Sequence, residues 1–167
     1  MAKVKKIVLT LSRVFPKTHP NAGQPTNFKE RLHNTVLGKR GQWCKLHTIR
    51  RNFDLWKVNA DKMQRGGFVL CVRQWSARPY NSPQVEIEQL HQPIGVQRIR
   101  MYFNYMKDTI TVYIDGDHQL ECSVEELAHN DGLTLQQFKD WFFGKSRRNF
   151  SNDVYEGVII HFTNFRY

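Results

Sequence analysis

The residues best suited to chemistry lie between Gly38 and Arg51, which read G-K-R-G-Q-W-C-K-L-H-T-I-R-R. Within this segment Lys45, Thr48 and Arg50 offer an amine, a hydroxyl and a guanidinium group a few residues apart. A hydroxyl can be activated by a neighbouring amine, and a guanidinium group can hold an oxyanion or a phosphate. We therefore predict that these three side chains line a site for an anionic, planar ligand.

The local chain must bring the three side chains to one side. The sequence predicts a strand over 46–51, in which Thr48 and Arg50 share a face because strand side chains alternate. Lys45 has the opposite parity. It joins the other two only if the chain is still turning at that position.

The predicted elements indicate an α+β fold with about six to seven strands and three to four short helices. Alternating or branched residues predict further strands over 4–11, 68–75, 84–90, 94–105, 109–114 and 154–163. The dipeptide Asp115-Gly116 predicts a two-residue hairpin. No repeat or linker divides the chain, so we expect one domain over 1–167.

Capping patterns predict where the helices begin. Asn27 with Glu30, Ser123 with Glu126, and Thr134 with Gln137 each have the capping-box spacing. We expect Gly38 to close the first helix, a helical turn over 53–61, and the last helix to end before Gly144, followed by a basic loop over 145–148.

The segment K-L-H-T-I-R, after a helix and a glycine-containing turn, resembles the signature of the ASCH family, a branch of the PUA-like barrels. D-G-L-T-L-Q-Q-F-K-D-W-F resembles the family's late helix and V-I-I-H-F-T its final strand, in the family's order. F-P-K-T-H-P-N-A-G-Q-P-T-x-F and R-Q-W-S-A-R-P-Y are similar to uncharacterised ASCH-like proteins of bacteria and their phages. The resemblance implies a small mixed PUA-like β-barrel decorated by helices.

Some ASCH proteins are metal-independent amidohydrolases that deacylate acetylcytidine with a lysine, a threonine and an acidic residue. The resemblance places Lys45, Thr48 and Asp131 in these roles, with Arg50 nearby to stabilise an oxyanion. Asp131 stands where the family enzyme has glutamate, and Leu46 replaces the first threonine of the K-T-x-T motif.

Binding without catalysis requires only cations and aromatic rings. We therefore predict an RNA- or nucleotide-binding domain with a cationic cleft between the 38–51 segment and the loop before the last long helix. An amidohydrolase acting on an acylated nucleoside is the first alternative, and a protein-interaction module using the basic face is the second. The predicted ligand-binding residues are Lys39, Arg40, Trp43, Lys45, Thr48, Arg50, Arg51, Arg73, Trp75 and Arg78.

Composition supports a polyanionic partner. The 167 residues include 25 Lys and Arg against 15 Asp and Glu, a net charge of +10. Three widely spaced cysteines favour neither a disulfide scaffold nor a zinc site and suit a reducing cytoplasm. No P-loop or Rossmann glycine pattern is present, so we expect neither a cofactor nor a metal. No window approaches the roughly 20 apolar residues of a membrane span, so no membrane is expected.

Overall fold

The computed structural model describes residues 4–39, 41–149 and 153–167, and within them it contains eight strands and four helices. The α+β class predicted from the sequence is confirmed. The strands are β1 (Lys5–Thr10), β2 (His47–Arg50), β3 (Phe68–Trp75), β4 (Gln84–Leu90), β5 (Gly95–Asn104), β6 (Thr109–Ile114), β7 (His118–Gln119) and β8 (Asp153–His161). The helices are α1 (Phe28–Val36), α2 (Phe53–Arg65), α3 (Val124–Asn130) and α4 (Leu135–Asn149).

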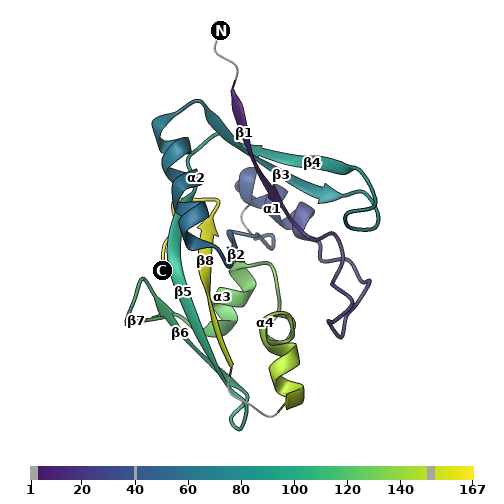
Figure 1. Cartoon of the computed structure of the whole chain (residues 1–167), viewed down its shortest axis with the longest axis vertical. Coiled ribbons are helices and arrows are strands. Elements are labelled where there is room, and N and C mark those ends of the chain that lie inside the picture. The colour runs from purple at the N-terminus through teal and green to yellow at the C-terminus, as the bar shows by residue number, and fades with distance from the viewer. Residues whose placement is uncertain (1–3, 40, 150–152) are drawn as a thin grey trace.

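The strands form two sheets (Figure 1). The smaller has the order β1-β3-β4, with β1 parallel to β3 and β4 antiparallel to it. The larger has the order β2-β8-β5-β6-β7 and is antiparallel throughout. Across the described residues these pairings do not close into a barrel, so the pairing alone does not establish the PUA-like barrel that the resemblance implies.

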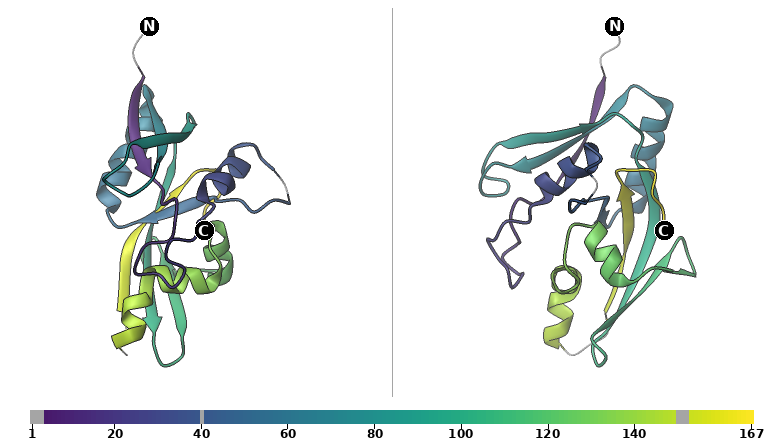
Figure 2. Two further views of the ribbon diagram at one scale, coloured as in Figure 1. Left: turned by 90° about the vertical axis from the view of Figure 1, so that its right-hand side faces the viewer. Right: turned by 180° about the vertical axis from the view of Figure 1, so that it is seen from behind.

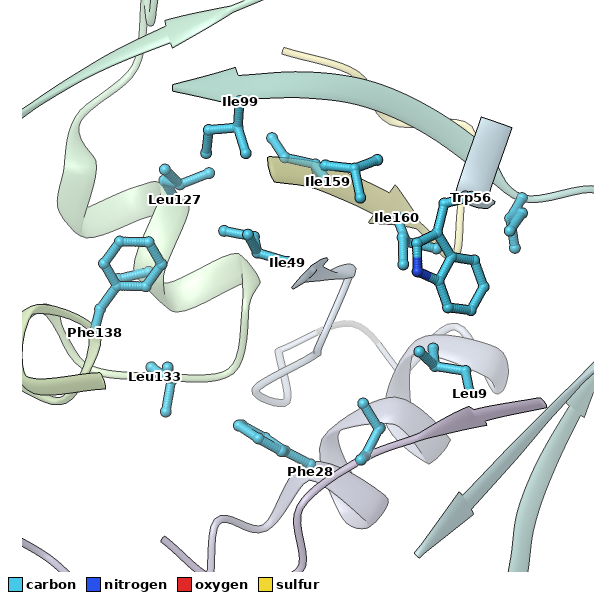
Figure 3. Packing of buried hydrophobic residues seen from close by; sticks show 14 of the residues in the cluster. Leu9, Phe28, Ile49, Trp56, Ile99, Leu127, Leu133, Phe138, Ile159 and Ile160 are labelled. Atoms are coloured by element: carbon cyan, nitrogen blue, oxygen red, sulfur yellow. The ribbon is translucent and has the colours of Figure 1, made fainter. Parts of the chain in front are cut away.

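The core lies on both faces of the larger sheet, because the consecutive residues Ile159 and Ile160 of β8 point to opposite faces and are both fully buried. Along β5 the side chains alternate between buried and exposed positions, and Ile99, Met101 and Phe103 face inward. Helices α3 and α4 cover this inner face (Figure 2), where the rings of Phe103 and Phe143 stack with centroids 5.3 Å apart. Leu127 of α3 lies beside Ile99 (Figure 3). On the opposite face of β5, Arg98, Arg100 and Tyr102 are exposed, and the start of α2 packs against Arg98.

Helix α1 starts where the sequence predicts, but not by the predicted capping box. Asn27 has a left-handed backbone with φ 58°, and its side chain makes no capping hydrogen bond. The predicted C-terminus at Gly38 is confirmed. The Gly38 N–H donates to the Thr35 carbonyl at 3.1 Å, which a positive φ of 60° at the glycine permits.

The predicted caps of α3 and α4 are confirmed. The Glu126 N–H donates to the Ser123 hydroxyl at 3.1 Å. Thr134 and Gln137 exchange hydrogen bonds of 3.0 and 3.2 Å between their backbone amides and side chains.

Three predicted boundaries are wrong. Helix α4 continues through Gly144 to Asn149, so the helix covers the segment expected to be a basic loop. An interior glycine costs only about 1 kcal/mol relative to alanine, and packing of the same helix at the buried Phe138 and Phe143 outweighs it. Helix α2 has thirteen residues rather than one turn, anchored by the buried Trp56 (Figure 3). The hairpin at Asp115 has three loop residues, because Ile114 pairs with His118.

Candidate functional site

Lys45 lies in irregular chain just before β2, so the condition for it to join Thr48 and Arg50 is met. Its side chain is only 1 % exposed. The ammonium group donates to Oδ1 of Asp131 at 2.7 Å and also to the Asp131 main-chain carbonyl. The structure thus brings together two residues that the motif resemblance associated across 86 positions.

The position of Asp131 explains this pairing. It is the C-cap of α3, and Gly132, with φ 79°, turns the chain away immediately after it. A cation at a helix C-terminus interacts favourably with the helix dipole and the last carbonyls. The Lys45 ammonium group lies over the Phe28 ring, 4.1 Å from the ring centroid, in a cation–π contact.

Burial shapes the charge of this pair. Burial lowers the pKa of Lys45 to about 8, although the Asp131 carboxylate opposes the shift. Burial likewise raises the pKa of Asp131, against the influence of Lys45 and Arg50. Lys45 and Arg50 share this carboxylate, so with lysine protonated the three groups carry one excess positive charge. An uncompensated buried charge is costly, which favours a neutral lysine or an anionic guest.

Thr48 and Arg50 form the second pair of the cluster. The guanidinium group of Arg50 donates to the Thr48 hydroxyl at 2.9 Å, to the Ile49 carbonyl at 2.8 Å and to the Thr10 carbonyl at 2.8 Å. The last bond ties β2 to the end of β1. Within the described chain no hydrogen bond joins the Lys45 amine to the Thr48 hydroxyl, so the cluster consists of two pairs and not a continuous relay.

Two histidines extend the buried polar cluster. His47 belongs to the K-L-H-T-I-R segment and is fully buried. Its Nε2 lies 2.8 Å from the Tyr167 hydroxyl. His161 is also fully buried, with Nε2 2.9 Å from Oε1 of Gln97. The Nδ1 atoms of both histidines have no hydrogen-bond partner among the described residues. Burial lowers the pKa of both imidazoles, which keeps them neutral. Only the tertiary pairing of β2 with β8 reveals this association.

The two segments expected to flank a cleft are in direct contact. The Leu46 N–H donates to the Asn130 carbonyl at 2.8 Å, and the Trp43 indole donates to the His129 carbonyl at 2.8 Å. The Trp43 ring stacks on His129 with centroids 4.9 Å apart and also lies 3.5 Å from the Arg31 guanidinium group. Contacts within the protein therefore already cover the Trp43 ring, which was expected to stack on a base.

The other predicted ligand residues are spread over the surface. Lys39 is exposed after α1, and Arg51 is exposed after β2 with its guanidinium group 4.5 Å from an aromatic ring of β8. Arg73 donates to a cysteine sulfur of its own strand at 3.3 Å, and Arg78 is exposed in the β3–β4 turn. Arg40 lies outside the described residues.

A cavity of about 440 Å³ opens between the start of α1 and the β3–β4 hairpin. Trp75, one of the predicted ligand residues, lines it. The remaining lining supplies a second ring, two cations and two amides that the sequence did not single out. These are Phe28, Arg13, Lys29, Asn27 and Gln74.

Gln74 is the most informative of these residues. It is only 6 % exposed, and its side-chain amide makes no hydrogen bond within the described chain. Gln74 lines the cavity, so its unbonded amide is available to a ligand there. Asn27 faces the same cavity with a strained backbone and an amide that the helix cap does not use.

Comparison with known protein families, with curated proteins and with solved structures finds no match to this chain. The ASCH resemblance stays a prediction from sequence motifs.

A metal site and a membrane-spanning helix are both absent from the described residues. No three of their His, Cys, Asp or Glu side chains are grouped so as to hold a metal ion. None of their helices has both the length and the apolar character needed to cross a membrane.

The buried cluster and the cavity meet at Phe28. Its ring contacts the Lys45 ammonium on one side and lines the cavity on the other. A ligand in the cavity therefore lies one aromatic ring away from the lysine.

Proposed function

We propose that this protein binds RNA or a nucleotide, and that the cavity beside Trp75 receives a base. The observation that carries the proposal is the cavity wall, where Gln74, whose side-chain amide makes no hydrogen bond within the described chain, and Trp75 are both lining residues. Ligand sites combine apolar walls with a few converging polar groups in cavities of about 300–1,000 Å³, and the cavity of about 440 Å³ falls in this range.

Each lining group has a role in this proposal. The base stacks on Trp75, and the amides of Gln74 and Asn27 hydrogen-bond its edge. Arg13 and Lys29 neutralise a phosphate. The first turn of α1 lies at the same cavity, and its backbone N–H groups favour an anion. The order of the ASCH-like motifs supports placing the two sheets in a PUA-like barrel of that type.

A thermal-shift screen of nucleoside monophosphates and short RNAs tests the proposal, because a ligand that binds the native state raises the melting temperature. The sharpest variant is Gln74→Leu. It removes the amide at similar volume, so we expect the unliganded protein to keep its stability while binding weakens about tenfold. Trp75→Ala should weaken binding of the same ligand.

Gln97→Leu is the matched control. Gln97 is equally buried, but its side chain bonds His161, Asp115 and the backbone of Tyr167. The same substitution there should lower stability. Absence of any nucleotide-induced shift, or unchanged binding in both Gln74→Leu and Trp75→Ala, contradicts the proposal.

A second candidate function is amide hydrolysis of an acylated nucleoside, and the 2.7 Å contact between Lys45 and Asp131 favours it. A lysine with a pKa of about 8 is partly neutral near physiological pH. This candidate requires substrate binding to bring the Lys45 amine, which makes no hydrogen bond to Thr48 within the described residues, within reach of that hydroxyl. The neutral amine then takes the Thr48 proton as the hydroxyl oxygen attacks the acyl carbon, Arg50 stabilises the oxyanion, and protonated Asp131 gives a proton to the departing amine. Water then hydrolyses the threonine ester.

Acetate release from acetylcytidine tests this second candidate. Wild type should release acetate, and Thr48→Val, which keeps the shape of the side chain, should not. Thr111→Val, at a threonine of β6 outside the cluster, should keep the activity. If wild-type protein that binds nucleotides releases no acetate, the hydrolase candidate fails while the binding proposal stands.

A further inference from the structure

The outer face of the larger sheet presents arginine and tyrosine side chains on neighbouring strands. Arg98, Arg100 and Tyr102 occupy the outward positions of β5, opposite the buried positions that face α3 and α4. Tyr113 of β6 stands beside them, and its ring lies 5.8 Å from that of Tyr102 in an edge-on arrangement. Tyr102 is 39 % exposed. Two aromatic rings and two guanidinium groups thus share one solvent-facing sheet surface, which we call the outer sheet face.

The arginines of this face are only loosely neutralised. Arg98 approaches the Asp54 carboxylate at 3.7 Å, and Arg100 approaches the Glu156 carboxylate at 3.0 Å. The arginine side chains remain 59 % and 45 % exposed, respectively. Exposed ion pairs of this kind contribute little, so a phosphate can displace the carboxylates without a large loss.

Two further contacts hold these groups in place. The Arg98 guanidinium group lies 3.8 Å from the Phe53 ring centroid. Tyr102, two residues along the same face of β5, raises the pKa of Arg100. Both cations are thus positioned by aromatic neighbours, which reduces the side-chain entropy that a ligand must overcome.

The outer sheet face has a hollow at one end. A cavity of about 300 Å³ is lined by Arg51, Arg98, Arg100 and Tyr113, together with Asn52 at the start of α2. Arg51 is a third arginine in this lining, with its guanidinium group 4.5 Å from the Tyr155 ring centroid. Across the lining, these three cations face the two carboxylates of Asp54 and Glu156, which leaves one excess positive charge.

We propose that the outer sheet face binds a single-stranded nucleic acid, with bases on Tyr102 and Tyr113 and phosphates on Arg51, Arg98 and Arg100. Exposed sheet aromatics flanked by cations bind single strands because every base has a face to stack, while phosphates need only positive charge. The inference rests on the proposed function, because it assumes the same class of ligand. It names a surface separate from the Trp75 cavity, built from the other sheet, so the two sites can be tested independently.

Fluorescence anisotropy with a labelled oligouridylate of about 10 nucleotides tests the inference, since single-strand sites span about 4–16 nucleotides. Tyr102→Ala should weaken binding about 5-fold to 150-fold, the range found for loss of one stacked base, while Tyr102→Phe should bind like wild type. The double variant Arg98→Gln/Arg100→Gln should reduce the slope of log affinity against log salt by about 1.4, because each single-strand phosphate contact contributes about 0.7.

The double variant Lys17→Gln/Arg65→Gln, at exposed positions away from this face, removes the same charge and should leave binding unchanged except for a small general electrostatic loss. A duplex of the same sequence should bind more weakly than the single strand. Equal binding of duplex and single strand overturns the stacking arrangement. Circular dichroism melting of every variant confirms that folding is retained.

The two proposals fail in different ways. If the Tyr102 and arginine variants bind the strand like wild type while Trp75→Ala does not, the outer sheet face is overturned and the cavity proposal stands. If the wild type binds no strand but nucleotides still raise its melting temperature, the outer sheet face is again overturned alone. Loss of strand binding in the sheet variants, with the nucleotide shift intact, supports the inference.

Discussion

Replacing Lys45 by methionine tests the buried pair at the centre of the candidate site. Methionine keeps most of the side-chain length but leaves the Asp131 carboxylate buried without its cation. Removing one partner of a buried pair costs about 3–5 kcal/mol, and Arg50, which also interacts with Asp131, makes no hydrogen bond within the described chain that could replace the lost one. For a chain of this size that loss lowers the melting temperature by about 6–20 °C.

The pH dependence gives the same pair a distinctive signature. The pKa of Lys45 is about 8 in the folded protein, where burial lowers it from its usual 10.5. Between these values the unfolded chain binds a proton that the folded protein does not, so the free energy of unfolding rises with pH across this window. The rise amounts to about 3 kcal/mol, at 1.36 kcal/mol per pKa unit. Lys45→Met should lack it.

Urea unfolding followed by tryptophan fluorescence measures both effects. The double variant Lys45→Met/Asp131→Leu removes both charges and should recover part of the stability lost in Lys45→Met, since Arg50 then loses the carboxylate that it shares. A cost below about 1 kcal/mol for the single variant would refute the reasoning, because it would mean that the pair is solvated. A rise in stability above pH 8 that persists in Lys45→Met would refute the assignment of that titration to this lysine.

Two further predictions concern the strands around the site. Gly157→Ala should lower the free energy of unfolding in urea by about 1–3 kcal/mol, because the added Cβ would clash with the Arg50 carbonyl oxygen. The control is Gly144→Ala, where no atom lies within 4 Å of the added Cβ, and it should be neutral or stabilising. Equal effects of the two substitutions would contradict the prediction. Burial, aided by Arg166, lowers the pKa of His161 from 6.5 to about 3, so the unfolded state binds more protons in that window and the melting temperature should fall with pH below about 6.5. His161→Gln should flatten this fall, and an unchanged acid branch would show that other groups cause it.

Local features of the sequence were sufficient to predict most elements. The alternation over Phe68–Trp75 predicts β3 with its observed bounds. The pairs Ser123 with Glu126 and Thr134 with Gln137 make the capping bonds expected of them. Both kinds of signal depend on neighbours a few residues away, which is why they can be read without the fold.

Long-range packing decided what local signals could not. Helix α4 passes through Gly144 because buried aromatic residues on the same helix anchor it, and the sequence signal for a stop was overridden. The arrangement of eight strands in two sheets also depends on contacts between distant segments. Neither result follows from periodicity or caps.

For the candidate site itself, the sequence by itself determined which residue types are present and that Thr48 and Arg50 share a strand face. The motif resemblance added Asp131 as their partner. Only the tertiary structure decided that Lys45 is buried against this carboxylate, and that the open cavity lies beyond Phe28 at Gln74 and Trp75. The physical reason is that burial and cavities arise where separate elements meet, so no single segment encodes them.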